Sequence, residues 1–184
     1  MKYYLCIVLF FGCLSISFSQ KKEESNLNNY LKINYYFTGL EFSYEIPLNN
    51  KFLFEAGAGI GAGSYIEEIP FVGESFSISF ESLPVLRLRG KLIYIYNRGK
   101  RLNNKKNINF NSGNYIALKN TFSSEKKDLY NNVLMSNFVW GIQRNIGGKW
   151  LLNIDGGFGY AKDFNTNLDR LYPSIGLEFS YVIF

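Results

Sequence analysis

Residues 39–63 read GLEFSYEIPLNNKFLFEAGAGIGAG, and their alternation of apolar and polar side chains predicts two β-strands. One face of residues 39–47 is apolar and carries Leu40, Phe42, Tyr44 and Ile46. The other face carries Glu41, Ser43 and Glu45. Residues 52–63 alternate in the same way, with Glu55 and glycines on the polar face. Asn49 and Asn50, which separate the two stretches, predict a tight turn.

A longer alternating stretch covers residues 75–97. Its even positions carry the apolar side chains Phe76, Ile78, Phe80, Leu86, Leu88, Leu92, Tyr94 and Tyr96. Its odd positions carry the polar side chains Ser75, Ser77, Ser79, Glu81, Arg87, Arg89 and Lys91. Because the parity does not change over the whole stretch, we predict one long strand with a bend at Pro84.

Further strands are predicted near residues 108–122, 132–145, 149–161 and 171–184, with a second tight turn at Gly147 and Gly148. Bacterial single-chain membrane barrels have an even number of strands, from eight upwards. We therefore add a short eighth strand at residues 30–37. The predicted fold is all-β: a closed antiparallel up-and-down transmembrane β-barrel of about 8 strands over residues 30–184, after a polar lead at residues 20–29.

Composition narrows the possible function classes. The chain of 184 residues is long enough for one domain, and 47% hydrophobic and 19% charged residues exclude an intrinsically disordered protein. It contains no histidine, which excludes Ser-His or Cys-His catalysis and histidine-ligated zinc. The formal net charge of +5 is compatible with a neighbour that carries phosphates, such as lipopolysaccharide. Nucleic acid is a poor partner for an exported chain.

Residues 1–19 have the features of a cleaved signal peptide. A basic start is followed by an apolar run at residues 5–14 and by small residues at the cleavage positions before Gln20. The alternative is a lipoprotein signal that uses Cys13, although the residues around this cysteine fit that motif badly. The second cysteine, Cys6, also lies in the signal, so the predicted mature chain contains no disulfide.

Alternation alone does not say which face points into the barrel. A soluble exported barrel that binds a small apolar ligand has its apolar face inside, whereas an outer-membrane barrel turns that face toward lipid. Aromatic residues near the predicted strand ends favour the membrane, because they suit its two interfaces: Tyr94, Tyr96, Trp140, Trp150 and Tyr160. We therefore predict a structural lumen charge network of Glu41, Glu45, Glu55, Arg87, Arg89, Lys91, Lys119, Asp155 and Glu178.

Two patterns resemble catalytic motifs, and we interpret both as structural. The glycines of residues 57–63 recur at every second position, without the helix that a phosphate-binding loop needs. They leave room in the lumen for long side chains such as Arg87 and Arg89, and the glycines of residues 156–159 are interpreted in the same way. The second pattern is the paired carboxylates of the polar face, which could serve general acid–base catalysis. Side chains fill an eight-stranded barrel, so a substrate would find little room beside these carboxylates. We expect no catalysis, cofactor or metal; the alternative is a lipid-modifying outer-membrane enzyme.

One basic cluster stands out, and it consists of Arg98, Lys100, Arg101, Lys105 and Lys106. Such a cluster near a membrane interface can bind lipid or lipopolysaccharide phosphates. If both termini face the periplasm, however, the count of strands places this connection on the periplasmic side, so we interpret it as a solvated turn.

The chain ends in Phe184, which follows an alternating strand and is out of phase with its apolar face. This ending is similar to the C-terminal insertion signal of outer-membrane barrels. The expected partners are therefore outer-membrane lipid and, through this last strand, the barrel-assembly machinery.

Three short segments resemble small outer-membrane β-barrel proteins of Bacteroidetes-type (flavobacterial) bacteria: residues 96–101 (YNRGKR), 111–115 (NSGNY) and 140–144 (WGIQR). The SFS segment before Gln20 resembles the signals of the same group. The resemblance implies the barrel fold and a location in the outer membrane, and it implies no activity. We therefore expect an outer-membrane protein with a structural, adhesive or envelope-assembly role.

Overall fold

The computed structural model describes residues 26–69, 73–78, 84–124 and 130–184. The predicted signal peptide, its cleavage site and both cysteines lie outside these residues. Among the described residues, no helix has the length and the apolar character needed to cross a membrane.

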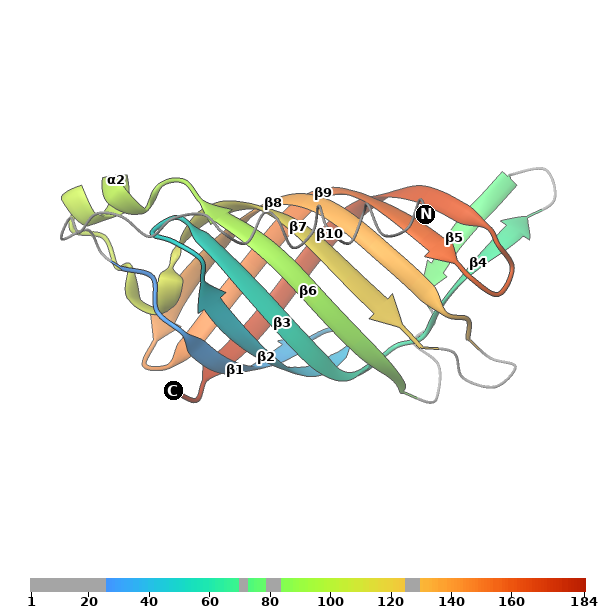
Figure 1. Ribbon diagram of the computed structural model, residues 1–184, viewed down its shortest axis with the longest axis horizontal. Helices are drawn as coiled ribbons and strands as arrows, with labels where there is room; N and C mark the ends of the chain where they lie inside the picture. Colours follow the sequence, from blue (N-terminus) through green and yellow to red (C-terminus); the bar gives the residue numbers. More distant parts are fainter. Residues whose placement is uncertain (1–25, 70–72, 79–83, 125–129) are drawn as a thin grey trace, which may run out of the picture.

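Eight antiparallel strands form a closed barrel, as the alternation predicts (Figure 1). In chain order they are β1 (Tyr30–Tyr36), β2 (Gly39–Pro47), β3 (Phe52–Gly61), β6 (Val85–Ile95), β7 (Gly113–Ser123), β8 (Val133–Gly147), β9 (Trp150–Asp163) and β10 (Asp169–Val182). Their order around the barrel is β1-β10-β9-β8-β7-β6-β3-β2, and pairing of β1 with β10 closes it. The predicted closed antiparallel barrel of eight strands is therefore confirmed, and the short strand placed at residues 30–37 is β1.

The prediction of one strand over residues 75–97 is wrong. Residues Gly73–Ile78 form β5, which pairs with β4 (Ser64–Ile69) in a separate two-stranded sheet. Barrel strand β6 begins at Val85, directly after Pro84. Proline has no backbone N–H to donate to a ladder, so a strand can begin there. Because the parity of the side chains is the same before and after this proline, alternation alone did not reveal the break.

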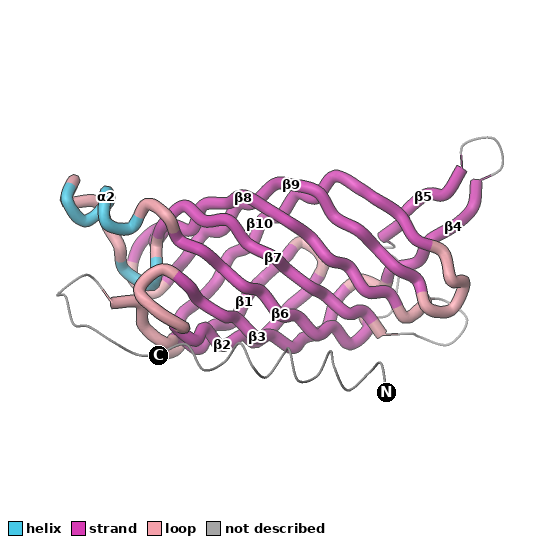
Figure 2. The backbone as a smooth tube through the Cα atoms, turned by 45° about the horizontal axis from the view of Figure 1, so that its top comes forward, coloured by secondary structure: helices cyan, strands magenta, loops and turns pink. Residues whose placement is uncertain are grey.

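The two ends of the barrel differ (Figure 2). One end, called here the α2 end, carries the short helix α2 (Arg98–Asn103), the 3-10 turn η1 (Asn109–Asn111) and the C-terminus. The opposite end, called here the hairpin end, carries β4 and β5. The sequence predicts neither helical segment, because six residues are too few to show a helical period.

Clusters of buried apolar side chains lie inside the barrel toward both ends. At the α2 end, a buried cluster consists of Leu27, Leu53, Ile93, Ile95, Tyr115, Ala117 and Val139. At the hairpin end, Ile66 of β4 packs with Val133, Met135 and Ala161 from the inner faces of β8 and β9. The charged part of the lumen lies between these two clusters.

Candidate functional site: the charged lumen and its cavity

The strands turn their apolar faces outward and their charged faces inward. On β6, the side chain of Leu88 is 47% exposed, whereas its neighbour Arg89 is 6% exposed. All nine residues of the predicted lumen network belong to inward faces, and seven of them are buried: Glu41, Glu45, Glu55, Arg89, Lys91, Asp155 and Glu178. A barrel in water has the reverse arrangement.

Lys32 of β1 binds two carboxylates in the part of the lumen toward the α2 end. Its Nζ lies 2.8 Å from Glu45 Oε1 and 2.5 Å from Glu55 Oε2, and all three side chains are buried. The second oxygen of Glu45 accepts a hydrogen bond of 2.7 Å from Asn111 Nδ2. These contacts join three strands of the wall to the η1 turn at the α2 end.

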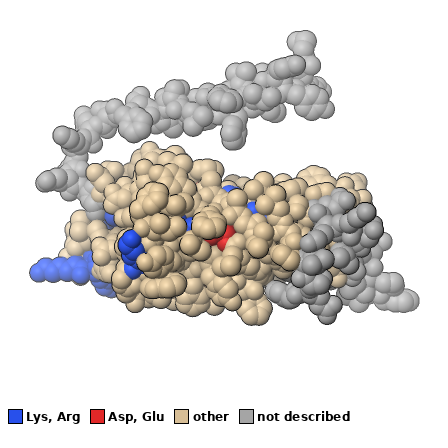
Figure 3. Space-filling model, turned by 90° about the horizontal axis from the view of Figure 1, so that it is seen from below, with Lys and Arg blue, Asp and Glu red and all other residues tan. Residues whose placement is uncertain are grey.

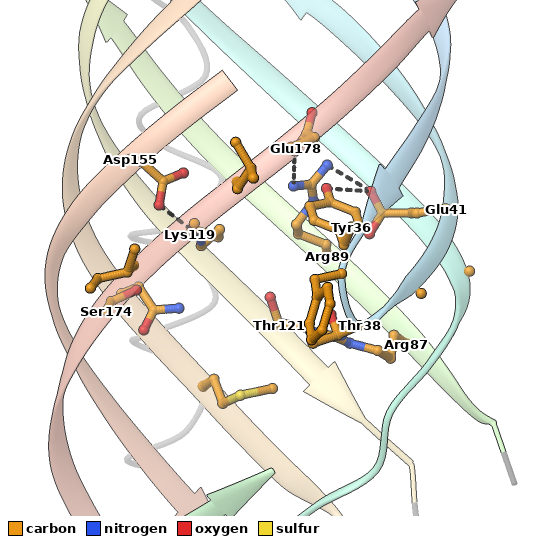
Figure 4. A pocket seen from close by; sticks show the side chains of 18 of the residues that line it. Tyr36, Thr38, Glu41, Arg87, Arg89, Lys119, Thr121, Asp155, Ser174 and Glu178 are labelled. Atoms are coloured by element: carbon orange, nitrogen blue, oxygen red, sulfur yellow. Dashed lines mark hydrogen bonds and ion pairs between the residues drawn. The ribbon is translucent and has the colours of Figure 1, made fainter. Parts of the chain in front are cut away.

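Arg89 is the centre of a second group of ion pairs (Figure 4). Its guanidinium contacts Glu41 at 2.6 Å and Glu55 at 2.5 Å, and its other terminal nitrogen contacts Glu178 at 3.0 Å. The ring of Tyr36 lies 5.0 Å from the guanidinium carbon, a distance that allows a cation–π contact. Because Glu55 also binds Lys32, the two groups form one network.

Asp155 of β9 lies beside the two lysines of the predicted network, Lys91 and Lys119. Lys119 Nζ lies 3.3 Å from Asp155 Oδ1, and Lys91 Nζ lies 4.0 Å from Asp155 Oδ2. Lys91 also donates a hydrogen bond of 3.1 Å to the hydroxyl of Tyr115, whose ring centre lies 4.4 Å away. These contacts join β6 and β7 to β9 across the lumen.

Arg87 differs from the other predicted cations. It points into the lumen, where its Nη1 donates a hydrogen bond of 2.8 Å to the hydroxyl of Thr38. In the part of the chain that the structure describes, no carboxylate oxygen lies within ion-pair distance of Arg87. The predicted network therefore forms around eight of its nine residues, and Arg87 stands apart from it.

Sequence reasoning missed Lys32, which is 0% exposed and lies at the centre of the network. The signal was present, since Lys32, Asn34 and Tyr36 occupy alternate positions of β1 and their neighbours Ile33 and Tyr35 are apolar. With Lys32 included, the ten residues comprise five cations and five carboxylates. Balanced burial matters, because an isolated buried charge costs several kcal/mol.

The glycines of β3 and β9 allow side chains and strands to come close. A Cβ at Gly57 would collide with the carboxylate of Glu41. One at Gly61 would collide with the backbone oxygen of Thr38 and would also lie 3.1 Å from Arg87 Cδ. A Cβ at Gly157 would collide with the backbone of β8. Gly156 is an exception to the prediction, because it faces outward and its Cβ would meet only one atom, at 3.9 Å. The space therefore serves Glu41 and Arg87 rather than a phosphate.

A cavity of about 510 Å³ occupies the lumen toward the hairpin end (Figure 4). Its charged lining residues are Glu41, Arg87, Arg89, Lys119, Asp155 and Glu178. All three carboxylates are held in ion pairs with lysine or arginine. The described residues contain no group of three or more His, Cys, Asp or Glu side chains that could hold a metal ion.

The basic cluster lies at the α2 end, and one of its members is structural. Arg98 is 6% exposed and donates hydrogen bonds to the carbonyl oxygens of Ile108 at 3.0 Å and Asn26 at 3.2 Å. Burial lowers the pKa of Arg98 from its ordinary value. The interpretation as a solvated turn fits Lys100, Lys105 and Lys106, which are exposed, and is wrong for Arg98.

Exposed aromatic residues lie toward both ends of the barrel, with Phe37, Tyr160 and Phe164 toward the hairpin end. Trp140 Nε1 donates a hydrogen bond of 2.7 Å to the hydroxyl of Tyr96, and the rings of Trp150 and Tyr181 lie 5.1 Å apart. Tyr160 lies near the hairpin end of β9. The prediction that Trp140 lies near a strand end is wrong, because it is the central residue of β8.

Comparison with known protein families, with curated proteins and with solved structures found no match to this chain.

Proposed function

We propose that the protein is an integral β-barrel of the bacterial outer membrane with a structural, adhesive or envelope-assembly role and without catalysis. The observation that carries the proposal is the inverted barrel, with apolar side chains outside and five ion-paired carboxylates inside. Large exposed apolar surfaces mark contact with a membrane or a partner. In this protein, exposed apolar side chains are distributed over all eight strands of the barrel, as a surrounding bilayer requires.

The height of the apolar surface supports a bilayer. The outward residues of β6, together with Tyr96 directly after it, run from Leu86 to Tyr96, which is ten steps along the chain. At about 3.3 Å per residue and a tilt of roughly 40°, these steps span about 25 Å. That height matches the apolar band of outer-membrane barrels.

The space-filling surface supports the same proposal (Figure 3). On the face shown, basic atoms gather at one end, and most of the described surface between the ends carries no charge. The alternative, a soluble barrel with a small apolar ligand, requires an apolar interior. The cavity of this barrel contains six charged side chains, which argues against that alternative.

We infer the orientation from the termini. With the C-terminus in the periplasm, the α2 end and its exposed lysines also face the periplasm. Strands β4 and β5 then face the outside of the cell. Phe184 is 69% exposed, and its carbonyl accepts a hydrogen bond of 2.9 Å from the backbone of Leu31. The barrel-assembly machinery would meet the chain at this seam between β1 and β10.

Quenching of tryptophan fluorescence tests the proposal. Trp140 and Trp150 are the two tryptophans of the chain, and each is 51% exposed on the outer surface. In vesicles of lipids brominated on their acyl chains near the head group, we expect strong quenching relative to unbrominated lipid. Unquenched fluorescence, together with recovery of the protein in the soluble periplasmic fraction of cells, would refute the proposal.

A further inference from the structure

The wall of the barrel is incomplete beside β10. Pairing between β1 and β10 runs only from Lys32–Val182 to Tyr36–Glu178. On the side toward the hairpin end, β10 continues to Asp169, and its described ladder partners there belong to β9. Pro173 lies in this part of β10, and prolines in sheets are confined mainly to edges. Residues 169–177, called here the upper half of β10, therefore form an edge of the sheet on the side toward β1.

The neighbouring hairpin ends early. Strands β1 and β2 are joined by a short turn at Phe37 and Thr38. The ladder between β2 and β3 ends at the pair Gly39 and Gly61. The side chain of Ile175, on the edge of β10, is 88% exposed. A lateral gap thus separates the tip of the β1–β2 hairpin from the upper half of β10.

The cavity reaches this gap. It is lined by the inward side chains of Arg87 and Lys119, and also by residues whose side chains point out of the barrel: Leu40, Ile60, Ile175 and Leu177. Leu40 lies on one side of the gap and Ile175 on the other, so the cavity borders the gap.

The polar end of the cavity has donors that the network does not use. Arg87 has one hydrogen bond to a neutral hydroxyl and no ion pair with a described carboxylate. The Arg87 guanidinium therefore suits an anion, because charge-assisted hydrogen bonds to arginine are strong. The volume of about 510 Å³ is typical of a small-ligand site.

We propose that this cavity binds an anionic amphiphile from the surrounding membrane. Its head group contacts Arg87 in the lumen, and its hydrocarbon chain leaves through the lateral gap between Leu40 and Ile175. The proposal rests on the membrane location proposed above, because only there does the gap open into hydrocarbon. A free anion needs no apolar exit, and an uncharged amphiphile needs no arginine.

Native mass spectrometry of protein folded in a neutral detergent tests this inference with three probes. Dodecyl phosphate carries both features, dodecanol lacks the charge, and inorganic phosphate lacks the chain. We expect one dodecyl phosphate per barrel and weak binding of the other two. Equal binding of dodecanol or of inorganic phosphate would overturn the proposal.

Variants locate the site. Arg87→Gln should weaken dodecyl phosphate binding about tenfold, which is the effect of losing one charge-assisted hydrogen bond. Arg87→Lys should keep most of the affinity. Arg144→Gln is the control, because Arg144 is an arginine near the α2 end that also donates to neutral oxygens. Equal losses in Arg87→Gln and Arg144→Gln would contradict the proposal.

A second variant covers the case in which Arg87→Gln does not fold. Ser174 lines the cavity, so Ser174→Trp fills it without removing a charge, and binding should be lost. Unchanged binding in folded Ser174→Trp would refute the site. Wild type that inserts into vesicles but binds no dodecyl phosphate would refute this inference alone, whereas wild type that does not insert would refute the membrane location as well.

Discussion

Arg89 and Glu178 form an ion pair of 3.0 Å across the full width of the barrel. Arg89 belongs to β6 and Glu178 to β10, and these strands are four positions apart in either direction around the wall. Since both side chains are buried, the pair crosses the lumen rather than its rim. A single guanidinium thereby holds opposite walls together and blocks the centre of the channel.

Removal of this guanidinium should destabilise the barrel. Arg89→Gln leaves Glu41 and Glu178 buried without their cation, and loss of one partner of a buried pair costs about 3–5 kcal/mol. We expect a loss of this size in the free energy of unfolding, measured by urea titration in vesicles. Arg144→Gln should cost about 1 kcal/mol or less, since Arg144 donates only to neutral oxygens. Similar losses in both variants would argue against the network.

The folded barrel should not conduct ions. Eight strands enclose a lumen just wide enough for side chains, and Lys32, Lys91 and Tyr115 fill it with exposures of 2% or less. Planar-bilayer recordings of the refolded protein should show no large stable pore. A reproducible conductance of porin size would mean that the lumen is open.

Adjacent glycines on β9 should respond differently to alanine. A methyl group at Gly157 collides with the backbone of Phe138, and overpacking of this kind costs roughly 1–3 kcal/mol. At Gly156 the methyl group points outward into open space, so Gly156→Ala should be neutral or slightly stabilising. Urea titration in vesicles compares the two variants, and equal stability would contradict the close approach of β8 and β9.

Alternation in the sequence predicted most of the wall because it reports which residues share a face. The strand predicted at residues 39–47 coincides with β2, and its acidic side chains Glu41 and Glu45 are inside. Alternation cannot detect a break that preserves parity, which is why β5 was merged with β6 across Pro84. It also overlooked α2, whose six residues show no period.

The contacts inside the lumen were beyond prediction. The sequence indicated that Arg89 and Glu178 share the inner surface, but their meeting depends on a curvature that brings residues 89 positions apart together. Lys32 was missed because its strand is short and mostly polar or aromatic. The cavity beside β10 depends on the early end of the β1–β2 hairpin, which is a property of register and not of residue type.

Refolding into lipid vesicles tests the membrane assignment most directly, with gel mobility compared before and after boiling. We expect wild type to insert and to show a heat-dependent shift in mobility. Leu88→Arg should insert poorly, because a charge on the lipid face costs roughly 2–4 kcal/mol near the bilayer midplane. A wild type that shows no lipid-dependent shift in mobility would contradict the account. So would a Leu88→Arg variant that, in the absence of lipid, folds as well as the wild type does.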